Sequence, residues 1–274
     1  MSYFYKKISR HYKDAIHKIT DSLSEADGID KLIVIPPPPA FFGAPRQSEF
    51  IPKFVPLLNL LVIPLSTDLR PTHEIVEAVE VKSSSIIPVN VVVHDFHYFN
   101  QQLLCGNPFF CHIRDWGIRL LDRTGQFFIH GPAPDYANFF LQAQNDLERW
   151  LKQGAGFSIA AWNTLNYPRV ASFCLHQAAE CSYSAIHTVF TGYKPATHNI
   201  VKWHKAALLF LPTLATIFPD DPDDQHYLYL LQKAYVEARY KEYTISDEEL
   251  KELFKRVDRL ITTASLGCTG WLEG

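Results

Sequence analysis

Three features are scarce in this sequence of 274 residues, and each scarcity excludes a class of protein. No apolar run approaches the roughly 18 residues that a membrane-spanning helix needs. The five cysteines are odd in number and include no Cys-x-x-Cys, which argues against a disulfide framework and a structural zinc site. Positive charge is not in excess: residues 1–130 hold 13 Lys and Arg against 13 Asp and Glu, and residues 131–274 hold 13 against 16. We therefore expect a soluble cytoplasmic protein that neither spans a membrane nor binds nucleic acid non-specifically.

The composition fits two modest domains. Hydrophobic residues make up 47% of the chain and aromatic residues 14%, which is enough to fill two cores. Glycine and proline punctuate the region after residue 100, and Gly131-Pro132-Ala133-Pro134 has the composition of a linker. We place the boundary near residue 130, which gives a first domain over residues 1–130 and a second over residues 131–274.

The first domain contains both helical and strand patterns. An amphipathic helix is expected from Tyr5 to about Gly28, because apolar residues recur there at helical spacing. Three apolar runs of strand length follow, at residues 31–35, 57–65 and 86–94. Between the last two, residues 72–82 have the pattern of a crossover helix. This order predicts a mixed α/β or α+β layer.

The second domain is expected to be helical throughout. Five segments have helical spacing, and they cover residues 135–153, 166–192, 197–218, 221–243 and 246–274. Local signals mark their ends: Pro168 lies in a first turn, Gly192 supplies a left-handed C-cap, and Asp221 is an N-cap. Ser246 and Glu249 form a capping box. The mostly short connections favour antiparallel packing of neighbouring helices.

Two stripes of side chains run along the helix that begins near Pro168. One is apolar and consists mostly of small side chains: Val170, Cys174, Ala178, Cys181, Ala185 and Val189. The other is polar: Ser172, His176, Glu180, Tyr183 and His187. The apolar stripe allows the close approach of another helix, which belongs either to the same bundle or to a twofold-related copy of the chain. The polar stripe is where specific contacts are expected.

Three segments of the second domain carry the motifs of a known family. They are Arg-Val-Ala-Ser-Phe-Cys-Leu-His-Gln-Ala-Ala-Glu from residue 169, Gly-Tyr-Lys-Pro-Ala-Thr-His-Asn from residue 192, and Ala-Tyr-Val-Glu-Ala-Arg-Tyr from residue 234. Together they strongly resemble the HEPN domain, a helical bundle found in prokaryotes and higher eukaryotes and often paired with a nucleotidyltransferase domain. The resemblance implies an α+β chain, with a nucleotidyltransferase-like mixed α/β domain at residues 1–130 and an all-α HEPN bundle at residues 131–274. HEPN domains commonly pair, so it also implies a homodimer.

A nucleotidyltransferase needs a Gly-Ser turn for the phosphates, an Asp-x-Asp on a strand and a third carboxylate on a neighbouring strand, because these carboxylates hold Mg²⁺. The strand at residues 57–65 resembles the Asp-x-Asp strand, and it aligns Leu57 and Asn59 with the two aspartates. The third position falls on Asn90, and the nearest candidate for the turn is Gly43, which no serine follows. The resemblance therefore implies a decayed transferase domain without catalytic residues or a cofactor.

The alternative is an active, Mg²⁺-dependent nucleotidyltransferase that modifies a small molecule or a partner protein. It would need carboxylates at other positions, and Asp68, Glu74 and Asp95 lie just past expected strand ends. His94-Asp95-Phe96-His97 also has residues that ligate metals. The histidine spacing suits one face of a helix, however, and a helix that begins there makes Asp95 an ordinary N-cap, so no metal site is expected.

HEPN domains that cut RNA carry an arginine followed four to six residues later by a histidine, a pair that binds the scissile phosphate and moves a proton. No histidine follows Arg239 in that window, so ribonuclease activity is not expected. Glu180 is instead the candidate carboxylate partner of Arg239, in a bridge that joins two helices.

The name of the HEPN family implies nucleotide binding, and the start of a helix at Thr197 would offer an anion site. The nucleotide-binding candidates are His176, Glu180, Lys194, Thr197, His198, Arg239 and Tyr240. The sequence thus predicts a non-catalytic, nucleotide- or partner-binding regulatory protein.

Overall fold

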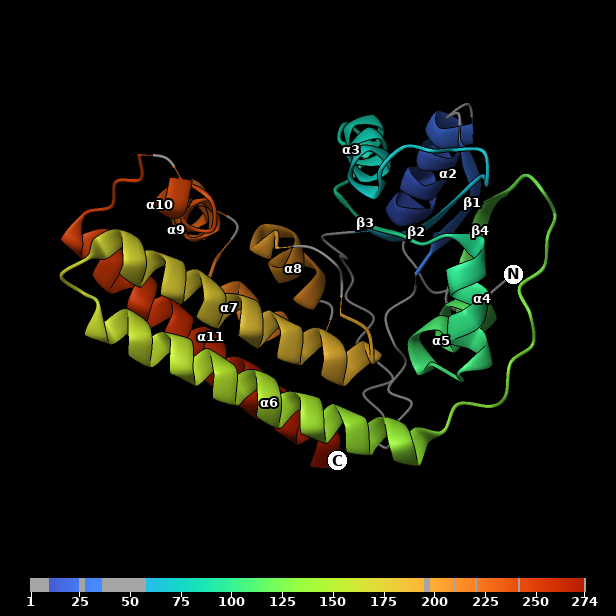
Figure 1. The fold of residues 1–274 in the computed structure, drawn as a ribbon. Coiled ribbons are helices and arrows are strands. Elements are labelled where there is room, and N and C mark those ends of the chain that lie inside the picture. The colour runs from blue at the N-terminus through green and yellow to red at the C-terminus, as the bar shows by residue number, and fades with distance from the viewer. Residues whose placement is uncertain are drawn as a thin grey trace. The chain divides into compact units, whose positions relative to one another are not determined.

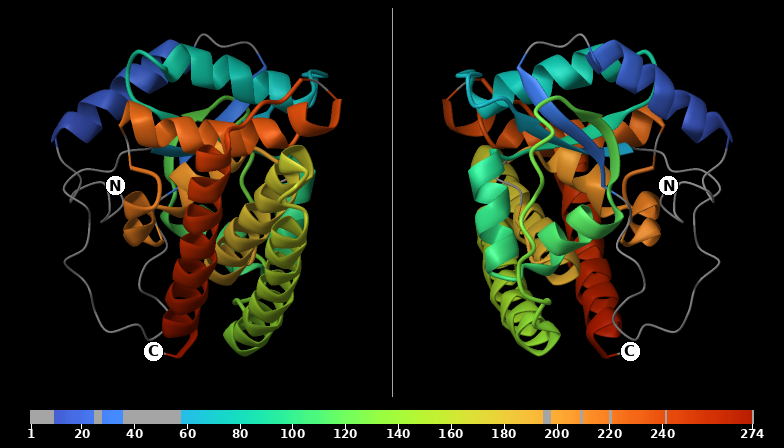
Figure 2. Two further views of the ribbon diagram at one scale, coloured as in Figure 1. Left: turned by 90° about the vertical axis from the view of Figure 1, so that its left-hand side faces the viewer. Right: turned by 90° about the vertical axis from the view of Figure 1, so that its right-hand side faces the viewer.

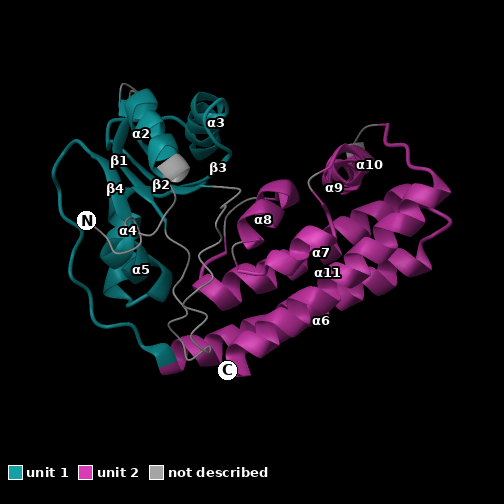
Figure 3. Cartoon of the chain, turned by 180° about the vertical axis from the view of Figure 1, so that it is seen from behind, with its two compact units in different colours: residues 1–136 teal, residues 137–274 magenta. Residues whose placement is uncertain are grey.

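The structure is a computed structural model in which the chain divides into two compact units, residues 1–136 and 137–274 (Figure 3). It describes residues 10–24, 28–35, 58–194, 198–208, 210–219, 221–240 and 242–273, without the side chains of residues 10–12 and 240. The first unit contains a small sheet and the described part of the second is helical, so the predicted mixed α+β class is confirmed. The nucleotidyltransferase fold stays a prediction.

The first unit is built on a four-stranded sheet of order β3-β2-β1-β4 (Figure 1). Its strands are β1 (Ile29–Val34), β2 (Leu58–Pro64), β3 (Val89–Val93) and β4 (Ile118–Asp122). Strands β2 and β3 are parallel and joined by the crossover helix α3 (Thr72–Ser83), as predicted, whereas β1 is antiparallel to β2 and to β4. The sequence analysis missed β4, because Arg119 and Asp122 interrupt its short apolar pattern.

Helices cover this sheet through apolar side chains. Helix α2 (Arg10–Ser24) and α3 pack side by side on one face (Figure 2). Helices α4 (Phe96–Leu104) and α5 (Pro108–Trp116) follow β3. Their rings form an aromatic core with Phe128, which follows β4: the ring centroid of Phe99 lies 4.2 Å from that of Phe128 and 5.2 Å from that of Phe110. Phe99, Phe110 and Phe128 are therefore core residues.

Three long helices dominate the second unit, namely α6 (Tyr136–Asn163), α7 (Pro168–Thr191) and α11 (Asp247–Glu273) (Figures 1 and 2). The shorter elements are α8 (Ile200–Ala207), the 3-10 helix η1 (Pro212–Thr216), α9 (Pro222–Ala234) and α10 (Glu237–Tyr240). Helix α7 is central, because it contacts α8, α9, α10 and α11.

The predicted helix ends are confirmed where the sequence carries a capping residue. Gly192 ends α7 with a positive φ of 63°, in the left-handed region that glycine adopts without strain. The Asp221 carboxylate accepts the Asp224 N–H at 3.0 Å. In the capping box, the Glu249 N–H donates to Ser246 Oγ at 3.2 Å and the Ser246 N–H donates to the Glu249 carboxylate at 2.8 Å.

Three predicted helices differ from the structure. The helix expected to end at residue 153 continues to Asn163, and Gly154 lies inside it, where a Cβ would be 3.2 Å from Cys181 Cβ of α7. The helix expected over residues 197–218 ends at Ala207, and Pro212 begins a separate 3-10 turn, since proline cannot continue a helix interior. The helix expected over residues 221–243 is divided by a turn into α9 and α10.

The small-residue stripe on α7 is core within a single chain. Ala178, Cys181, Ala185 and Val189 are at most 4% exposed, Cys174 is partly exposed, and Val170, at the start of the helix, is 46% exposed. The interpretation of the stripe as a dimer interface is therefore wrong, and the homodimer itself stays a prediction. None of the helices in the described part of the chain combines the length and the apolar character needed to cross a bilayer.

Charge at the middle of this stripe should prevent folding. We expect Ala178→Glu to lower the free energy of unfolding by about 3 kcal/mol or more, because the carboxylate would be buried without a partner. Val170→Glu, at the exposed end of the same stripe, is the matched control and should change it by less than about 1 kcal/mol. Circular dichroism during thermal denaturation measures both. Equal stability of the two variants would contradict the assignment of the stripe to the core.

Candidate functional site

The aligned transferase positions that the structure describes form a hydrogen-bonded pair on the sheet. The parallel register places Asn59 of β2 opposite Asn90 of β3, and Asn90 Nδ2 donates to Asn59 Oδ1 at 2.8 Å. Asn59 is buried, so its amide oxygen is satisfied inside the unit. Gly43 and Leu57 lie outside the described residues. The two amides bring no charge to this point of the sheet.

The acidic residues that could replace them have other roles. Arg70 donates to both oxygens of Asp68, and these hydrogen bonds lower the pKa of the Asp68 carboxyl. The Asp95 carboxylate accepts the Tyr98 N–H at 2.7 Å, so Asp95 is the N-cap of α4, as expected. Glu74 lies in the first turn of α3. Within the described ranges, no three His, Cys, Asp or Glu side chains are grouped so that they could hold a metal ion.

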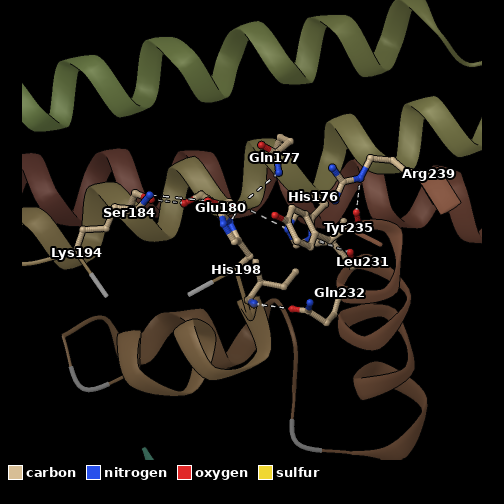
Figure 4. Close-up of polar contacts among 11 residues, drawn as sticks. His176, Gln177, Glu180, Ser184, Lys194, His198, Leu231, Gln232, Tyr235 and Arg239 are labelled. Carbon is tan, nitrogen blue, oxygen red and sulfur yellow. Dashed lines mark hydrogen bonds and ion pairs between the residues drawn. The ribbon is translucent and has the colours of Figure 1, made fainter. Parts of the chain in front are cut away.

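A second polar cluster surrounds Glu180 in the middle of α7 (Figure 4). His198 Nδ1 lies 3.1 Å from each carboxylate oxygen of Glu180, and His176 Nε2 lies 3.6 Å from Oε2. Gln177 Nε2 donates to Oε2 at 3.3 Å, and Lys194 Nζ is 3.9 Å from Oε1. Two imidazoles, an amide and an ammonium group therefore surround one carboxylate.

Each partner of Glu180 is held by its own local structure. His176 is one helical turn before Glu180, is fully buried, and directs Nδ1 to the Leu231 carbonyl on α9 at 3.0 Å. Lys194 and His198 lie on the connection that leaves α7 at Gly192. This connection reaches α8 through Asn199, whose side chain accepts the Lys202 N–H at 3.0 Å.

Helix α8 therefore begins later than expected. Its N-cap is Asn199 and its first residue is Ile200, so His198 precedes the helix. Thr197, the expected N-cap, is outside the described residues. Gln232 Oε1 accepts the Ile200 N–H at 2.7 Å, which ties the start of α8 to α9. The cluster thus joins three segments of the bundle.

Tyr235, directly after α9, stacks on both histidines. Its ring centroid lies 5.0 Å from that of His176 and 4.8 Å from that of His198, with interplanar angles of 29° and 19°. The Arg239 guanidinium lies 4.5 Å from the Tyr235 ring and 4.9 Å from the Phe173 ring, at distances typical of cation–π contacts. These contacts place Arg239 at the edge of the cluster.

The predicted bridge between Glu180 and Arg239 is wrong. The ion-pair partners of Glu180 are His176, Lys194 and His198, and Arg239 Nε donates to the Tyr235 carbonyl at 2.6 Å. The reason is geometric: Arg239 lies against Phe173, seven residues before Glu180 on α7, whereas His198 of the α7–α8 connection lies beside the carboxylate.

The environment of Glu180 keeps it ionised. Burial by itself would raise the pKa of its carboxyl, but the hydrogen bonds and charges of His176 and His198 outweigh burial and lower the pKa to about 2. A carboxylate with so low a pKa is a weak proton acceptor at neutral pH. His187, two turns later on the same helix, is also buried, and burial lowers its pKa to about 4, although its Nε2 contacts the Trp203 carbonyl at 3.4 Å.

The structure brings together most of the predicted binding residues. His176, Glu180, Lys194 and His198 form the cluster, and Arg239 joins it through the ring of Tyr235; the side chain of Tyr240 is not described. Only some can be reached by a ligand: His198 and Arg239 are exposed and Lys194 is partly exposed, whereas His176 is buried. Sequence reasoning assigned no role to Gln177, Gln232 or Tyr235. Tyr235 belongs to the Ala-Tyr-Val-Glu-Ala-Arg-Tyr segment, and this position in a family motif could have identified it as a site residue.

The comparison with known families agrees with this arrangement. Residues 147–266 match the family model of the HEPN domain, so the resemblance is confirmed for the bundle that carries the Glu180 cluster. The match does not extend to residues 1–146, which include the whole sheet. No curated protein matches the chain.

The Glu180 cluster should make the stability of the protein depend on pH. The pKa of Glu180 is about 2 in the folded chain against a usual value of 4.5, so the unfolded chain takes up the proton first as the pH falls. Its contribution is present above pH 4.5 and is lost between pH 4.5 and 2. At pH 7 we expect Glu180→Gln to lower the free energy of unfolding by about 2 kcal/mol.

Denaturant titrations from pH 7 to pH 3 measure this dependence. The difference between the wild type and Glu180→Gln should shrink as the pH falls below 4.5. Glu148→Gln, at an exposed position of α6, is the matched control and should leave the pH profile unchanged. A difference that stays constant from pH 7 to pH 3 would show that the charge of Glu180 does not stabilise the bundle.

Proposed function

We propose that this chain is a non-catalytic regulatory protein that binds a nucleotide or a protein partner through its HEPN domain, and that its first unit is a decayed nucleotidyltransferase domain. The observation that carries the proposal is the Asn59–Asn90 pair, which occupies two of the three positions aligned with carboxylates. Transfer of a nucleotidyl group requires Mg²⁺, a hard cation that charged oxygen ligands hold. Two amides that bond to each other supply no such charge.

The surroundings of the pair explain how a fold can persist without the chemistry. The rest of β2, Leu58 and Leu60 to Ile63, is buried and apolar, so packing of the strand does not depend on the polar position. Function belongs to the site rather than to the fold that carries it.

The Glu180 cluster supports ligand binding by the second unit. Lys194 and His198 place donors beside Glu180, and the positively charged Arg239 lies against the Tyr235 ring on which His198 stacks. Phosphate groups favour such donors. Glu180 holds His198 and Lys194 in place before any ligand arrives, which lowers the entropic cost of binding. Arg239 has no histidine in the window that HEPN ribonucleases use, so RNA cleavage is not part of the proposal.

The protein should transfer no nucleotide. Incubation with labelled ATP, GTP, CTP or UTP and Mg²⁺ or Mn²⁺ should give no metal-dependent labelled product, because Asn59 and Asn90 supply no negative charge. The readout is separation of the labelled nucleotide from any labelled protein or small molecule. Metal-dependent labelling that survives Asn59→Ala would contradict the alignment and favour the active transferase.

A nucleotide ligand should raise the melting temperature of the intact chain. A ligand at about 100 times its dissociation constant adds about 2.7 kcal/mol to stability, which a thermal-shift screen over nucleoside mono-, di- and triphosphates detects. Lys194→Ala removes one charged contact, so about ten times more ligand should be needed for the same shift in melting temperature. Lys152→Ala, at an exposed position of α6, is the control. If no nucleotide raises the melting temperature, the ligand of the proposed function is a protein partner.

A further inference from the structure

The two edges of the sheet differ in how they are protected from pairing with another strand. Edge strands in native proteins carry charges, prolines or bulges that prevent such pairing. Strand β4 has these devices: Arg119 and Asp122 are charged, and its pairing with β1 shifts register between Leu32 and Ile33. Strand β3, at the opposite edge, has none of them. It reads Val-Asn-Val-Val-Val, and its register with β2 runs without a shift from Val89 to Val93.

The backbone groups on the outer side of β3 can be assigned from its bonds to β2. The Leu58 N–H donates to the Pro88 carbonyl at 3.0 Å, and the His94 N–H donates to the Val62 carbonyl at 3.2 Å. The backbone N–H and C=O groups of the even-numbered residues of this segment therefore point toward β2. The two polar groups of one residue point to the same side of a strand and alternate along it, so those of Val89, Val91 and Val93 face outward. No backbone hydrogen bond joins these three residues to any other described residue.

We propose that this edge pairs with the same edge of a second copy of the chain, with β3 antiparallel to its mate about a twofold axis at Val91. In that register Val91 faces the partner's Val91, and Val89 faces the partner's Val93. Facing residues of an antiparallel pair exchange both N–H···O=C bonds when their polar groups point at each other, as these do. Six backbone hydrogen bonds result, and all the outward groups of the three valines are satisfied.

The composition of β3 favours a second copy over an unrelated peptide. A twofold contact places the same residues against each other, so a charged edge would oppose itself. Strand β3 has no charged residue, and the three residues whose backbone groups point outward are all valine. An antiparallel copy therefore places valine opposite valine at each of these positions. Pairs of β-branched residues stabilise antiparallel strands. The four described strands of each copy would together form a continuous sheet of eight, which is within the range of open sheets.

The proline variant Val89→Pro tests the pairing. Proline at the first position of β3 removes only an outward N–H, and the bond from Leu58 to the Pro88 carbonyl is kept. Light scattering of the full chain should give about twice the monomer mass of 31.4 kDa for the wild type. Val89→Pro should raise the dissociation constant of the dimer at least about tenfold, because the substitution removes one N–H from each copy and therefore two hydrogen bonds from the pair. Val89→Ala keeps the N–H and is the matched control.

A charge swap at Val92 gives a second, independent test. In the proposed register Val92 and its mate are diagonal neighbours about 7–8 Å apart. Val92→Lys alone and Val92→Glu alone should each be monomeric, and an equimolar mixture of the two should dimerise again. Circular dichroism establishes that each variant is folded. The amide protons of Val89, Val91 and Val93 should exchange slowly in the wild-type dimer and rapidly in the monomeric variants.

Two results would overturn the inference. A wild-type chain that is monomeric at millimolar concentration does not use this edge for self-association, even if the edge captures an extended peptide. A dimer that Val89→Pro and the single charges at Val92 leave intact is formed by a different surface. Neither outcome bears on the proposed function, because no ligand takes part in either measurement.

Discussion

The second unit depends on one interaction, the collection of hydrogen-bond donors around the buried carboxylate of Glu180. An ionised carboxylate inside a helical bundle is destabilising unless donors surround it. Glu180 lies on α7, which contacts most of the other helices, and its donors come from α7 itself and from the connection to α8. His176 extends the cluster to α9 through the Leu231 carbonyl. The requirement to satisfy one charge therefore fixes three segments relative to one another.

The stacking of Tyr235 follows from the same requirement. The two imidazoles that face Glu180 present their rings to Tyr235, and Arg239 then lies against the tyrosine. The exposed cations of this region are ordered by contacts inside the bundle rather than by a ligand. Such preorganisation raises affinity for an anion, because the side chains lose little freedom on binding. It also means that loss of Glu180 would release Lys194 and His198 as well as destabilise the bundle.

Local features were predictable from the sequence, and features set by packing were not. The Ser246–Glu249 capping box and the Gly192 C-cap depend on residues a few positions apart, so their signals are complete in the sequence. The partner of Glu180 depends on the rotation of α7 against its neighbours, which the spacing does not give, so the prediction named Arg239 and missed His198. The length of α6 was missed because glycine is read as a helix end, whereas Gly154 provides a close contact between helices.

The asparagine pair was predictable only in part, and its chemistry explains why amides suit this position. The alignment placed Asn59 and Asn90 on neighbouring strands, and the parallel register brings them within hydrogen-bond distance. Two carboxylates at this separation repel each other unless a cation lies between them, and one of them would otherwise be forced to bind a proton. An amide can donate to a neighbouring amide without any ion, as Asn90 donates to Asn59 here. Amides at these two positions avoid this repulsion, so the Asn59–Asn90 pair suits a buried point of the sheet.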